Sequence, residues 1–248
     1  MDRLTTKRDR FWSYEAYVRD RWVQTQAAQL PAGSWVLDAG AGATKYRPYF
    51  AHCRYEAQDF CRYEGPLVKY GANINYVCDI SSIPLPDACL DVILCTEVFE
   101  HVVDPMAVLK EFSRLIKPGG RVFLSAPLLS SLHMEPFHYY GGFTPHWYRH
   151  WLPRSGFSVD SILPVGGPGR TSVVYIQSMY TVWAEKEKTL GPARRLGSRV
   201  LRALWKIPAH IVLPRLLPKV DPWIGGATIC SEYLVAGTRF VQENTRRK

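Results

Sequence analysis

Three aspartates stand at positions where a carboxylate can bind a ligand. Asp38, Asp59 and Asp79 each end a short segment with the composition of a β-strand. Carboxylates accept hydrogen bonds from hydroxyl and ammonium groups. In a parallel α/β sheet, ligands bind beyond the carboxyl ends of the strands. The three side chains therefore predict a site for a ligand that carries hydroxyl or cationic groups.

The turn after Asp38 narrows the class of ligand. It reads Ala39-Gly40-Ala41-Gly42, and two glycines allow a tight turn and a close approach of a ligand to the main chain. A dinucleotide site needs a small residue at position 45, where this chain has Lys45, and the carboxylate of Asp38 would repel a pyrophosphate. The turn therefore favours a cationic ligand without phosphate.

Residues suited to proton transfer follow the later strands. Glu97 and His101 are four residues apart, so they face one way if this stretch is helical. A second group of imidazole and phenol side chains lies in residues 130–143: His133, His138, Tyr139 and Tyr140. Imidazoles suit proton removal, and aromatic rings suit stacking on a substrate. The structural alternatives are a buried, hydrogen-bonded histidine and a packed loop without a chemical role.

An alternation of strands and helices must position these residues. Apolar segments typical of strands cover residues 34–37, 54–59, 75–79, 90–95 and 121–125. Helical patterns occupy residues 11–29, 104–115 and 144–151. This alternation predicts an α/β fold with a doubly wound, mostly parallel sheet that helices cover on both faces.

Composition agrees with one large domain, since 47% of the 248 residues are hydrophobic. No apolar run reaches membrane-spanning length, and the first ten residues do not resemble a signal peptide. The six cysteines include no CxxC pair, which indicates reduced thiols in a cytoplasmic protein. His146 and His150 have i,i+4 spacing, but no third ligand is evident, so the sequence predicts no metal site.

The chain resembles class I S-adenosylmethionine-dependent methyltransferases, most closely their small-molecule and glycan-pathway branch. The motifs of the resemblance run in order through residues 33–160: Asp38-Ala39-Gly40-Ala41-Gly42, Gln58-Asp59, Cys78-Asp79-Ile80, Cys95-Thr96-Glu97-Val98-Phe99-Glu100-His101-Val102 and Leu115-Ile116-Lys117-Pro118-Gly119-Gly120. The resemblance implies a seven-stranded Rossmann-like sheet with an antiparallel last strand. It also implies S-adenosyl-L-methionine as the cofactor.

The resemblance assigns a role to each motif. The implied cofactor-binding residues are Asp38, Gly40, Gly42, Asp59, Asp79, Ile80 and Glu97. Asp59 would bind the ribose hydroxyls, Asp79 the adenine side and Glu97 the methionine end. The alternative for Asp38 and Asp79 is N-capping of a following helix.

Candidate catalytic residues are His101, His133 and His138, and Tyr139 and Tyr140 are candidate substrate contacts. The tetrapeptide with paired prolines that marks amide and DNA-base N-methyltransferases is missing after the fourth strand. We therefore expect methylation at oxygen, carbon or an amine, with oxygen favoured.

Nearly all of the net charge of +9 lies in one late segment. Residues 186–219 hold nine Lys and Arg against Glu187 alone, which is +8, whereas residues 1–185 hold 18 of each sign. Residues 190–208 read as an amphipathic helix with a basic face and a Leu/Trp face. The segment favours peripheral contact of residues 190–217 with an anionic membrane; the alternative is an accessory subdomain that packs on the domain or on a second copy.

The sequence thus predicts four parts: an N-terminal helical cap (1–30), an S-adenosylmethionine-binding core (31–165), a basic helical insertion (166–222), and the final strand with the C-terminal tail (223–248). The return to the sheet is expected at residues 225–228 and 233–236. The neutral body makes a nucleic-acid partner unlikely.

The function expected is methyl transfer to a small-molecule or lipid-linked glycan acceptor, in the cytoplasm or at the inner membrane face. One alternative is a methyltransferase of a soluble phenolic or natural-product metabolite. A second is a non-catalytic S-adenosylmethionine-binding partner. The acceptor and the oligomeric state stay open at this stage.

Overall fold

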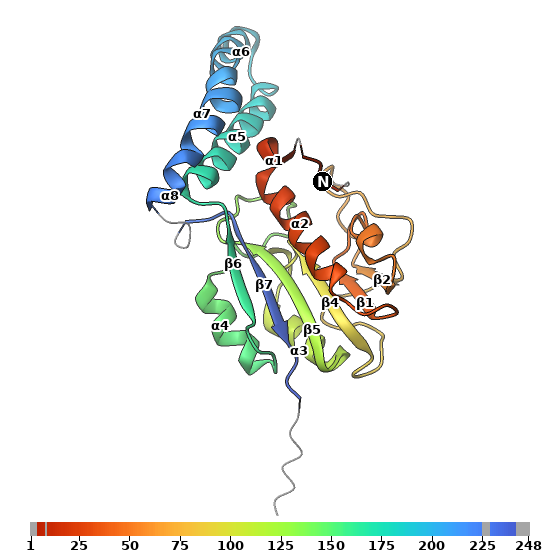
Figure 1. The fold of residues 1–248 in the computed structure, drawn as a ribbon. Coiled ribbons are helices and arrows are strands. Elements are labelled where there is room, and N and C mark those ends of the chain that lie inside the picture. The colour runs from red at the N-terminus through yellow and green to blue at the C-terminus, as the bar shows by residue number, and fades with distance from the viewer. Residues whose placement is uncertain (1–3, 8, 225–228, 242–248) are drawn as a thin grey trace, which may run out of the picture.

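The computed structural model describes residues 4–7, 9–224 and 229–241. Its centre is a seven-stranded sheet in the order β3-β2-β1-β4-β5-β7-β6 (Figure 1). The strands are β1 (Trp35–Ala39), β2 (Arg54–Asp59), β3 (Tyr76–Val77), β4 (Leu90–Thr96), β5 (Ile116–Pro127), β6 (Ser161–Val165) and β7 (Glu232–Thr238). Strands β1 to β5 pair in parallel, and β7 runs antiparallel to both β5 and β6. The predicted doubly wound, mostly parallel fold class is confirmed.

Helices cover both faces of the sheet. The helices of the domain body are α1 (Asp9–Trp12), α2 (Tyr14–Ala28), α3 (Pro105–Leu115) and α4 (Pro145–Arg154), with 3-10 turns η1 (Arg47–Phe50) and η2 (Phe99–His101). Alternate residues of one strand enter different cores: Val92 and Leu94 of β4 pack with α2 and η1, and Ile93 and Cys95 with α3 and α4. Because successive side chains of a strand point to opposite faces of the sheet, each face packs against its own layer of helices. The same alternation determines which side chains lie on each face at the carboxyl edge.

Local sequence explains where the body helices begin. Asp104 caps α3 by accepting hydrogen bonds from the backbone N–H groups of Met106 and Ala107, at 2.9 and 3.1 Å. The expected helix over residues 11–29 is divided at Ser13 into α1 and α2. Among the described residues, only the short η1 lies between β1 and β2 and no helix lies between β3 and β4. Asp38 and Asp79 therefore cap no helix.

A helical insertion lies between β6 and β7 and projects from one end of the sheet (Figure 1). It consists of α5 (Pro168–Glu187), α6 (Pro192–Ile207), the π-helical turn η3 (Pro208–Val212), α7 (Leu213–Leu216), the 3-10 turn η4 (Leu217–Val220) and α8 (Asp221–Ile224). The two ends of the insertion are joined where the carboxylate of Asp221 in α8 accepts a hydrogen bond of 2.6 Å from the backbone N–H of Gly169 in α5. Over the described residues, each helix is too short or too polar to cross a bilayer.

The expected return to the sheet is seen in part. Residues 233–236 lie within β7, whereas residues 225–228 lie outside the described residues.

Candidate functional site

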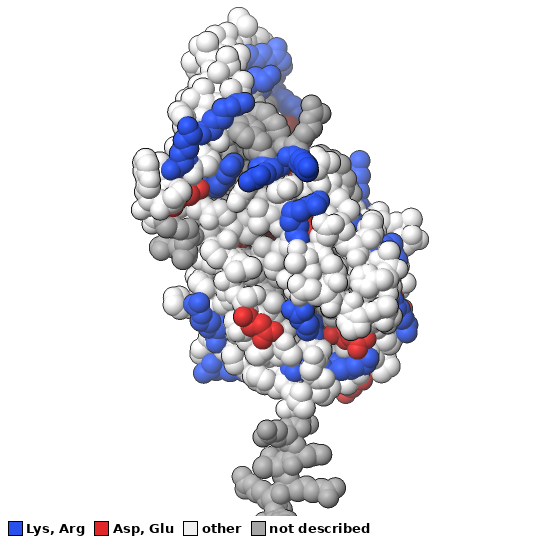
Figure 2. Space-filling view, viewed as in Figure 1, with Lys and Arg blue, Asp and Glu red and all other residues white. Residues whose placement is uncertain are grey.

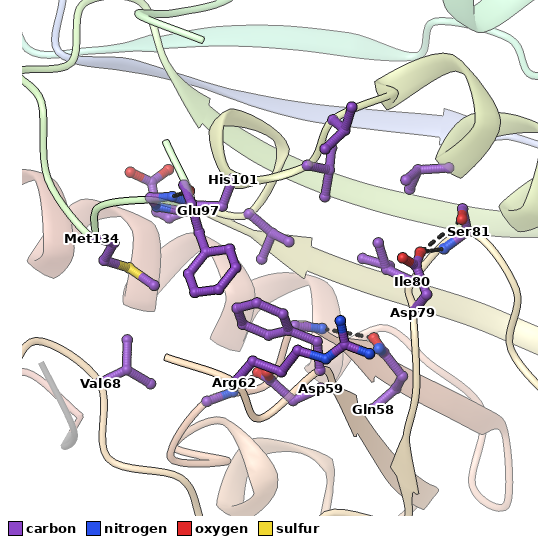
Figure 3. Close-up of a pocket in the computed structure, with 18 of the residues that line it drawn as sticks. Gln58, Asp59, Arg62, Val68, Asp79, Ile80, Ser81, Glu97, His101 and Met134 are labelled. Carbon is purple, nitrogen blue, oxygen red and sulfur yellow. Dashed lines mark hydrogen bonds between the residues drawn. The ribbon is translucent and has the colours of Figure 1, made fainter. Parts of the chain in front are cut away.

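A cavity of about 340 Å³ opens at the carboxyl edge of β1, β2 and β4, and we call it the first cavity. Asp79, Ile80 and Ser81 stand at one end, and Glu97, His101 and Met134 at the other, with Asp59 between them (Figure 3). Its volume is within the range of cavities that enclose small ligands.

The turn after β1 forms one wall of the first cavity. Gly40 has φ of +74°, and a Cβ atom at this position would lie 2.4 Å from Cγ2 of Val98. The backbone N–H of Gly40 donates to the carbonyl oxygen of Gln58 (2.9 Å) and to its side-chain oxygen (3.2 Å). Gly42, with φ of +50°, donates its N–H to Asp59 at 2.8 Å. Any other residue at position 40 would therefore be strained and would collide with Val98.

Asp59 is held by the main chain and remains available to a ligand. Its carboxylate accepts hydrogen bonds from the N–H groups of Gly42 and Cys61, the latter at 3.1 Å. The residue is only 5% exposed, and this burial raises the pKa of its carboxyl group. It lines the first cavity, so a pair of ligand hydroxyls can donate to its remaining lone pairs.

Asp79 and Ile80 close the other end of the first cavity. Asp79 accepts hydrogen bonds from the N–H and hydroxyl groups of Ser81, at 2.8 and 2.6 Å, and these bonds lower the pKa of its carboxyl. Ile80 is 8% exposed and offers a flat apolar contact. A carboxylate next to an apolar side chain suits a planar heterocycle with an exocyclic amine.

Asp38 lies behind the turn, outside the first cavity. It is buried, and its carboxyl accepts a hydrogen bond from the hydroxyl of Tyr55. Burial raises the pKa of Asp38 to about 7. It lines a second cavity instead.

The second cavity, of about 540 Å³, adjoins the first at Gly40, Glu97 and His101. Its walls come from α2, the ends of β4 and β5, the loop after β5, the start of β7, and α5 of the insertion. Carboxyl groups are numerous in this lining: Glu15, Asp38, Glu97, Glu100 and Glu232. The insertion contributes Val174, Tyr175 and Ser178.

Arg19 of α2 lines the second cavity and binds two of its carboxyl groups. Its guanidinium pairs with Glu97 at 2.9 Å and with Glu232 at 2.5 Å. Burial opposes the ionisation of Glu97, but Arg19 and the hydroxyl of Ser125, which donates at 2.8 Å, together hold the pKa of Glu97 below its usual value. Burial holds the pKa of Glu232 well above its usual value despite Arg19. The cluster therefore holds one ionised and one protonated carboxyl group near neutral pH.

The loop after β5 brings three histidines together. The ring centroids lie 4.7 Å apart for His101 and His133, 4.6 Å for His133 and His138, and 5.6 Å for His101 and His138. The backbone N–H groups of Tyr139 and Tyr140 donate to the carbonyl oxygen of Glu100, which fixes the loop against η2. Burial lowers the pKa of His101 to about 4, so its imidazole is neutral at pH 7.

The two tyrosines occupy different places. Tyr139 lines the first cavity. The hydroxyl of Tyr140 donates to the carbonyl oxygen of Val103 at 2.9 Å, and the residue lines neither cavity.

A comparison with known protein families relates the segment that forms this site to a described domain. A family model described as a methyltransferase domain matches residues 37–124, which run from β1 through β5. The matched residues include the turn after β1, the end of β2 and the loop after β4. From β1 through β5 the chain is similar to methyltransferase domains.

Curated relatives match parts of the chain. A ubiquinone biosynthesis O-methyltransferase of Coxiella burnetii is 48% identical over 54 residues, 21% of this chain and 23% of the relative. One of Pseudomonas paraeruginosa is 31% identical over 118 residues, 44% and 50% of the two chains. An uncharacterised methyltransferase of a Mycobacterium species is 32% identical over 137 residues, 51% and 53%. The chain thus spans about half the length of these relatives or less.

Solved structures share the fold of the chain at low identity. A Galdieria sulphuraria protein, provisionally described as a sarcosine dimethylglycine methyltransferase, superposes with a TM-score of 0.56 at 12% identity, over 92% of this chain and 88% of that one. A [4+2]-cyclase superposes with a TM-score of 0.52 at 15% identity, over 90% and 81%. Since one of these neighbours is described as a cyclase, the shared fold alone does not fix the reaction.

Sequence reasoning missed several residues that shape the site. Gln58 fastens the turn after β1, and Arg19, Glu100 and Glu232 line the second cavity. Gln58 and Glu100 stand inside the quoted motifs, and their polarity among buried neighbours was an available signal. Nothing local distinguishes Arg19 and Glu232 from other surface charges.

Proposed function

We propose that this chain binds S-adenosyl-L-methionine in the first cavity and transfers its methyl group to an oxygen atom of an acceptor in the second cavity. The observation that carries the proposal is that the two cavities meet at Gly40, Glu97 and His101. A cofactor whose reactive group lies at this junction faces the acceptor directly.

The proposed cofactor contacts follow the order of groups along the first cavity. Asp79 and Ile80 would contact the adenine, Asp59 the ribose hydroxyls, and Gly40 and Gly42 the methionine portion. Glu97 lies at the methionine end. Asp38 lies behind the turn and bonds the hydroxyl of Tyr55, so it is not among the proposed cofactor contacts.

The reaction is an in-line displacement at the methyl carbon. An acceptor O–H loses its proton, an oxygen lone pair forms the new bond to carbon, and the carbon–sulfur bond breaks with its electron pair moving to sulfur. The positive sulfur becomes a neutral thioether, so no external reductant or oxidant is needed. The chain has to position the oxygen and promote loss of its proton. His101 at the junction and His133 in the second cavity are the proposed residues for the second task, and His138, which lines neither cavity, lies with its ring 4.6 Å from that of His133 and supports them.

We infer that the acceptor is a neutral, hydroxyl-rich molecule such as a glycan. The polar lining of the second cavity combines five carboxyl groups with Arg19, Lys45, two imidazoles and several hydroxyl groups, so ionised carboxylates are offset by cations and the lining can both donate to and accept from the hydroxyl groups of an acceptor. The second candidate is a phenolic acceptor. It is favoured by apolar lining residues such as Leu67, Leu129 and Val174, and by the similarity of the chain to ubiquinone biosynthesis O-methyltransferases.

A substrate panel tests the proposal. We expect the purified chain to transfer label from methyl-labelled S-adenosylmethionine to neutral oligosaccharides in preference to catechols and to sugar phosphates. Transfer to catechols alone would select the phenolic candidate. Cofactor binding in calorimetry without transfer to any acceptor would mean a non-catalytic binding partner.

We further propose that the insertion contacts an anionic membrane at the inner face, where a lipid-linked glycan would be presented. The apolar side of α6 is exposed to solvent: Leu196, Val200, Leu201, Leu204, Trp205 and Ile207 are 41–69% exposed. Lys and Arg side chains surround broad uncharged surface over the insertion (Figure 2). An exposed Leu/Trp stripe bordered by bases suits the interface of an anionic bilayer.

Part of the basic face of α6 is occupied within the protein. The guanidinium groups of Arg199 and Arg202 bond Glu187 at 3.1 and 2.9 Å, and Arg195 donates to the carbonyl oxygens of Lys188 and Leu190. These three arginines therefore stabilise the packing of α5 on α6. The apolar stripe is the better target for a membrane test.

Vesicle flotation tests the membrane contact. We expect the chain to float with phosphatidylglycerol vesicles and less with phosphatidylcholine vesicles, and Leu204→Glu to reduce flotation at least tenfold. Leu163→Glu is the matched control, because Leu163 is also an exposed leucine (47%) but lies on β6. Equal flotation of Leu204→Glu and the parent chain would refute the contact.

A further inference from the structure

We propose that Glu100, His101 and His133 bind one divalent transition-metal cation at the boundary between the two cavities. One ligand atom from each of these three side chains lies within 4.8 Å of the others. Ligands of a tetrahedral zinc ion at 2.0–2.1 Å lie about 3.4 Å from one another. An approach of the ligand atoms by up to about 1.4 Å completes the site.

Both histidines are already oriented as metal ligands. Nδ1 of His101 lies 2.6 Å from the carbonyl oxygen of Phe137, and Nδ1 of His133 lies 2.8 Å from that of Ser131. A carbonyl oxygen only accepts hydrogen bonds, so each Nδ1 carries the hydrogen and each Nε2 keeps its lone pair. Metal-binding histidines are held in this way, with the second ring nitrogen donating to a carbonyl or carboxylate.

Glu100 supplies the observation that is independent of the histidines. The residue is 2% exposed, and its Oε2 atom is buried without a hydrogen-bond partner among the described residues. Its Oε1 atom lies 3.8 Å from Nε2 of His101. A buried oxygen without a partner is costly, and a cation between Glu100 and the two imidazoles would satisfy it.

A third imidazole stands next to this group. Nε2 of His138 is also buried without a hydrogen-bond partner in the part of the chain that the structure describes. Its ring lies 4.6 Å from that of His133, beside the three proposed ligands. A set of two or three imidazoles with one carboxylate favours zinc, manganese or iron over magnesium and calcium, which prefer oxygen ligands.

The position of the cation suggests a role in methyl transfer, and this role rests on the proposed function. His101 lines both cavities, whereas Glu100 and His133 line the second. A cation held there would contact the acceptor oxygen and lower the pKa of its hydroxyl group. The O–H bond breaks, its proton passes to water, and the oxygen attacks the methyl carbon. Two of the histidines thus act through the cation and do not take the proton themselves.

Calorimetry on the full chain after chelator treatment tests the site with Zn²⁺, Mn²⁺ and Mg²⁺ as separate probes. We expect one Zn²⁺ or Mn²⁺ per chain with a Kd in the micromolar range or below, and Mg²⁺ at least tenfold weaker. Glu100→Gln and His133→Ala should each weaken binding at least tenfold. His146→Ala should not, since His146 is an exposed imidazole on α4.

Binding of Co²⁺ gives a second readout, because d–d absorption bands report nitrogen ligation directly, and His133→Ala should shift them. The proposal is overturned if none of the cations binds at one per chain, or if His133→Ala and Glu100→Gln bind as the parent does. Titration of the metal-free chain with S-adenosylmethionine keeps the two ideas separate. Cofactor binding without cation binding removes the metal site alone, and cation binding without cofactor binding removes the proposed function alone.

Discussion

Replacing Asp59 by asparagine removes one carboxylate charge from the first cavity and keeps the size of the side chain, but an amide nitrogen takes the place of one of the two oxygens that accept from Gly42 and Cys61. The parent carboxylate accepts hydrogen bonds from Gly42 and Cys61, which use two of roughly four acceptor positions. The positions that remain can accept from the proposed ribose hydroxyls, because Asp59 lines the first cavity. A hydrogen bond to a charged group contributes about 1.5–3 kcal/mol, and the asparagine oxygen retains part of it. We expect a loss of about 2 kcal/mol, which is roughly a 30-fold increase in Kd.

Calorimetry with two ligands makes this prediction specific to the ribose. S-adenosylhomocysteine should bind Asp59→Asn about 30-fold more weakly than it binds the parent. Its 2′,3′-dideoxyribose analogue should bind both proteins nearly equally. Asp87→Asn is the control, because Asp87 is a carboxylate with a 78% exposed side chain that pairs with Arg114 outside both cavities. An equal loss for the two ligands, or no loss for either, would refute the assignment of Asp59 to the ribose.

Three other substitutions test the surrounding site. Gly40→Val should abolish cofactor binding in calorimetry while the chain stays folded by circular dichroism, because the added Cβ collides with Val98; retained binding would place the cofactor elsewhere. Burial raises the pKa of Asp38 from 3.8 to about 7, so folding takes up a proton, and the free energy of unfolding should fall as pH rises from about 4 to about 7. Urea denaturation at pH 5 and pH 8 should show a smaller fall in Asp38→Asn, and an unchanged fall would contradict the assignment. Arg19→Met should lower the free energy of unfolding by about 3 kcal/mol, because the ionised carboxylate of Glu97 loses its cation beside the buried Glu232, and Glu97→Gln in the same background should recover part of the loss.

Residues that act through their own segment were predictable from the sequence. The glycine turn and Asp59 carry their function in local spacing, and the alternation of strands and helices was sufficient for the fold class. Pairings between distant segments were not predictable. Arg19 and Glu232 meet across the sheet, and the loop after β5 places His133 and His138 against His101, although no periodicity or spacing relates these positions.

Helix α6 of the insertion has one feature that the sequence predicted and one that it did not. Its periodicity indicated an apolar stripe on α6, and the structure exposes that stripe. The same periodicity suggested a basic face without partners inside the protein. In the structure, Glu187 at the end of α5 forms ion pairs with Arg199 and Arg202 of that face. The packing partner of a helix face depends on the turn that precedes it, and helical spacing contains no information about that turn.

The pairing of Arg19 with Glu232 also bears on how this protein is made. The two residues are separated by 213 positions, so a ribosome releases the arginine long before its second carboxyl partner exists. Contacts of such long range form late, because the intervening chain must first be ordered. The lining of the second cavity is therefore complete only when β7 enters the sheet between β5 and β6. A growing chain can build the turn after β1 early, but it cannot form the complete second cavity before synthesis has passed the last strand.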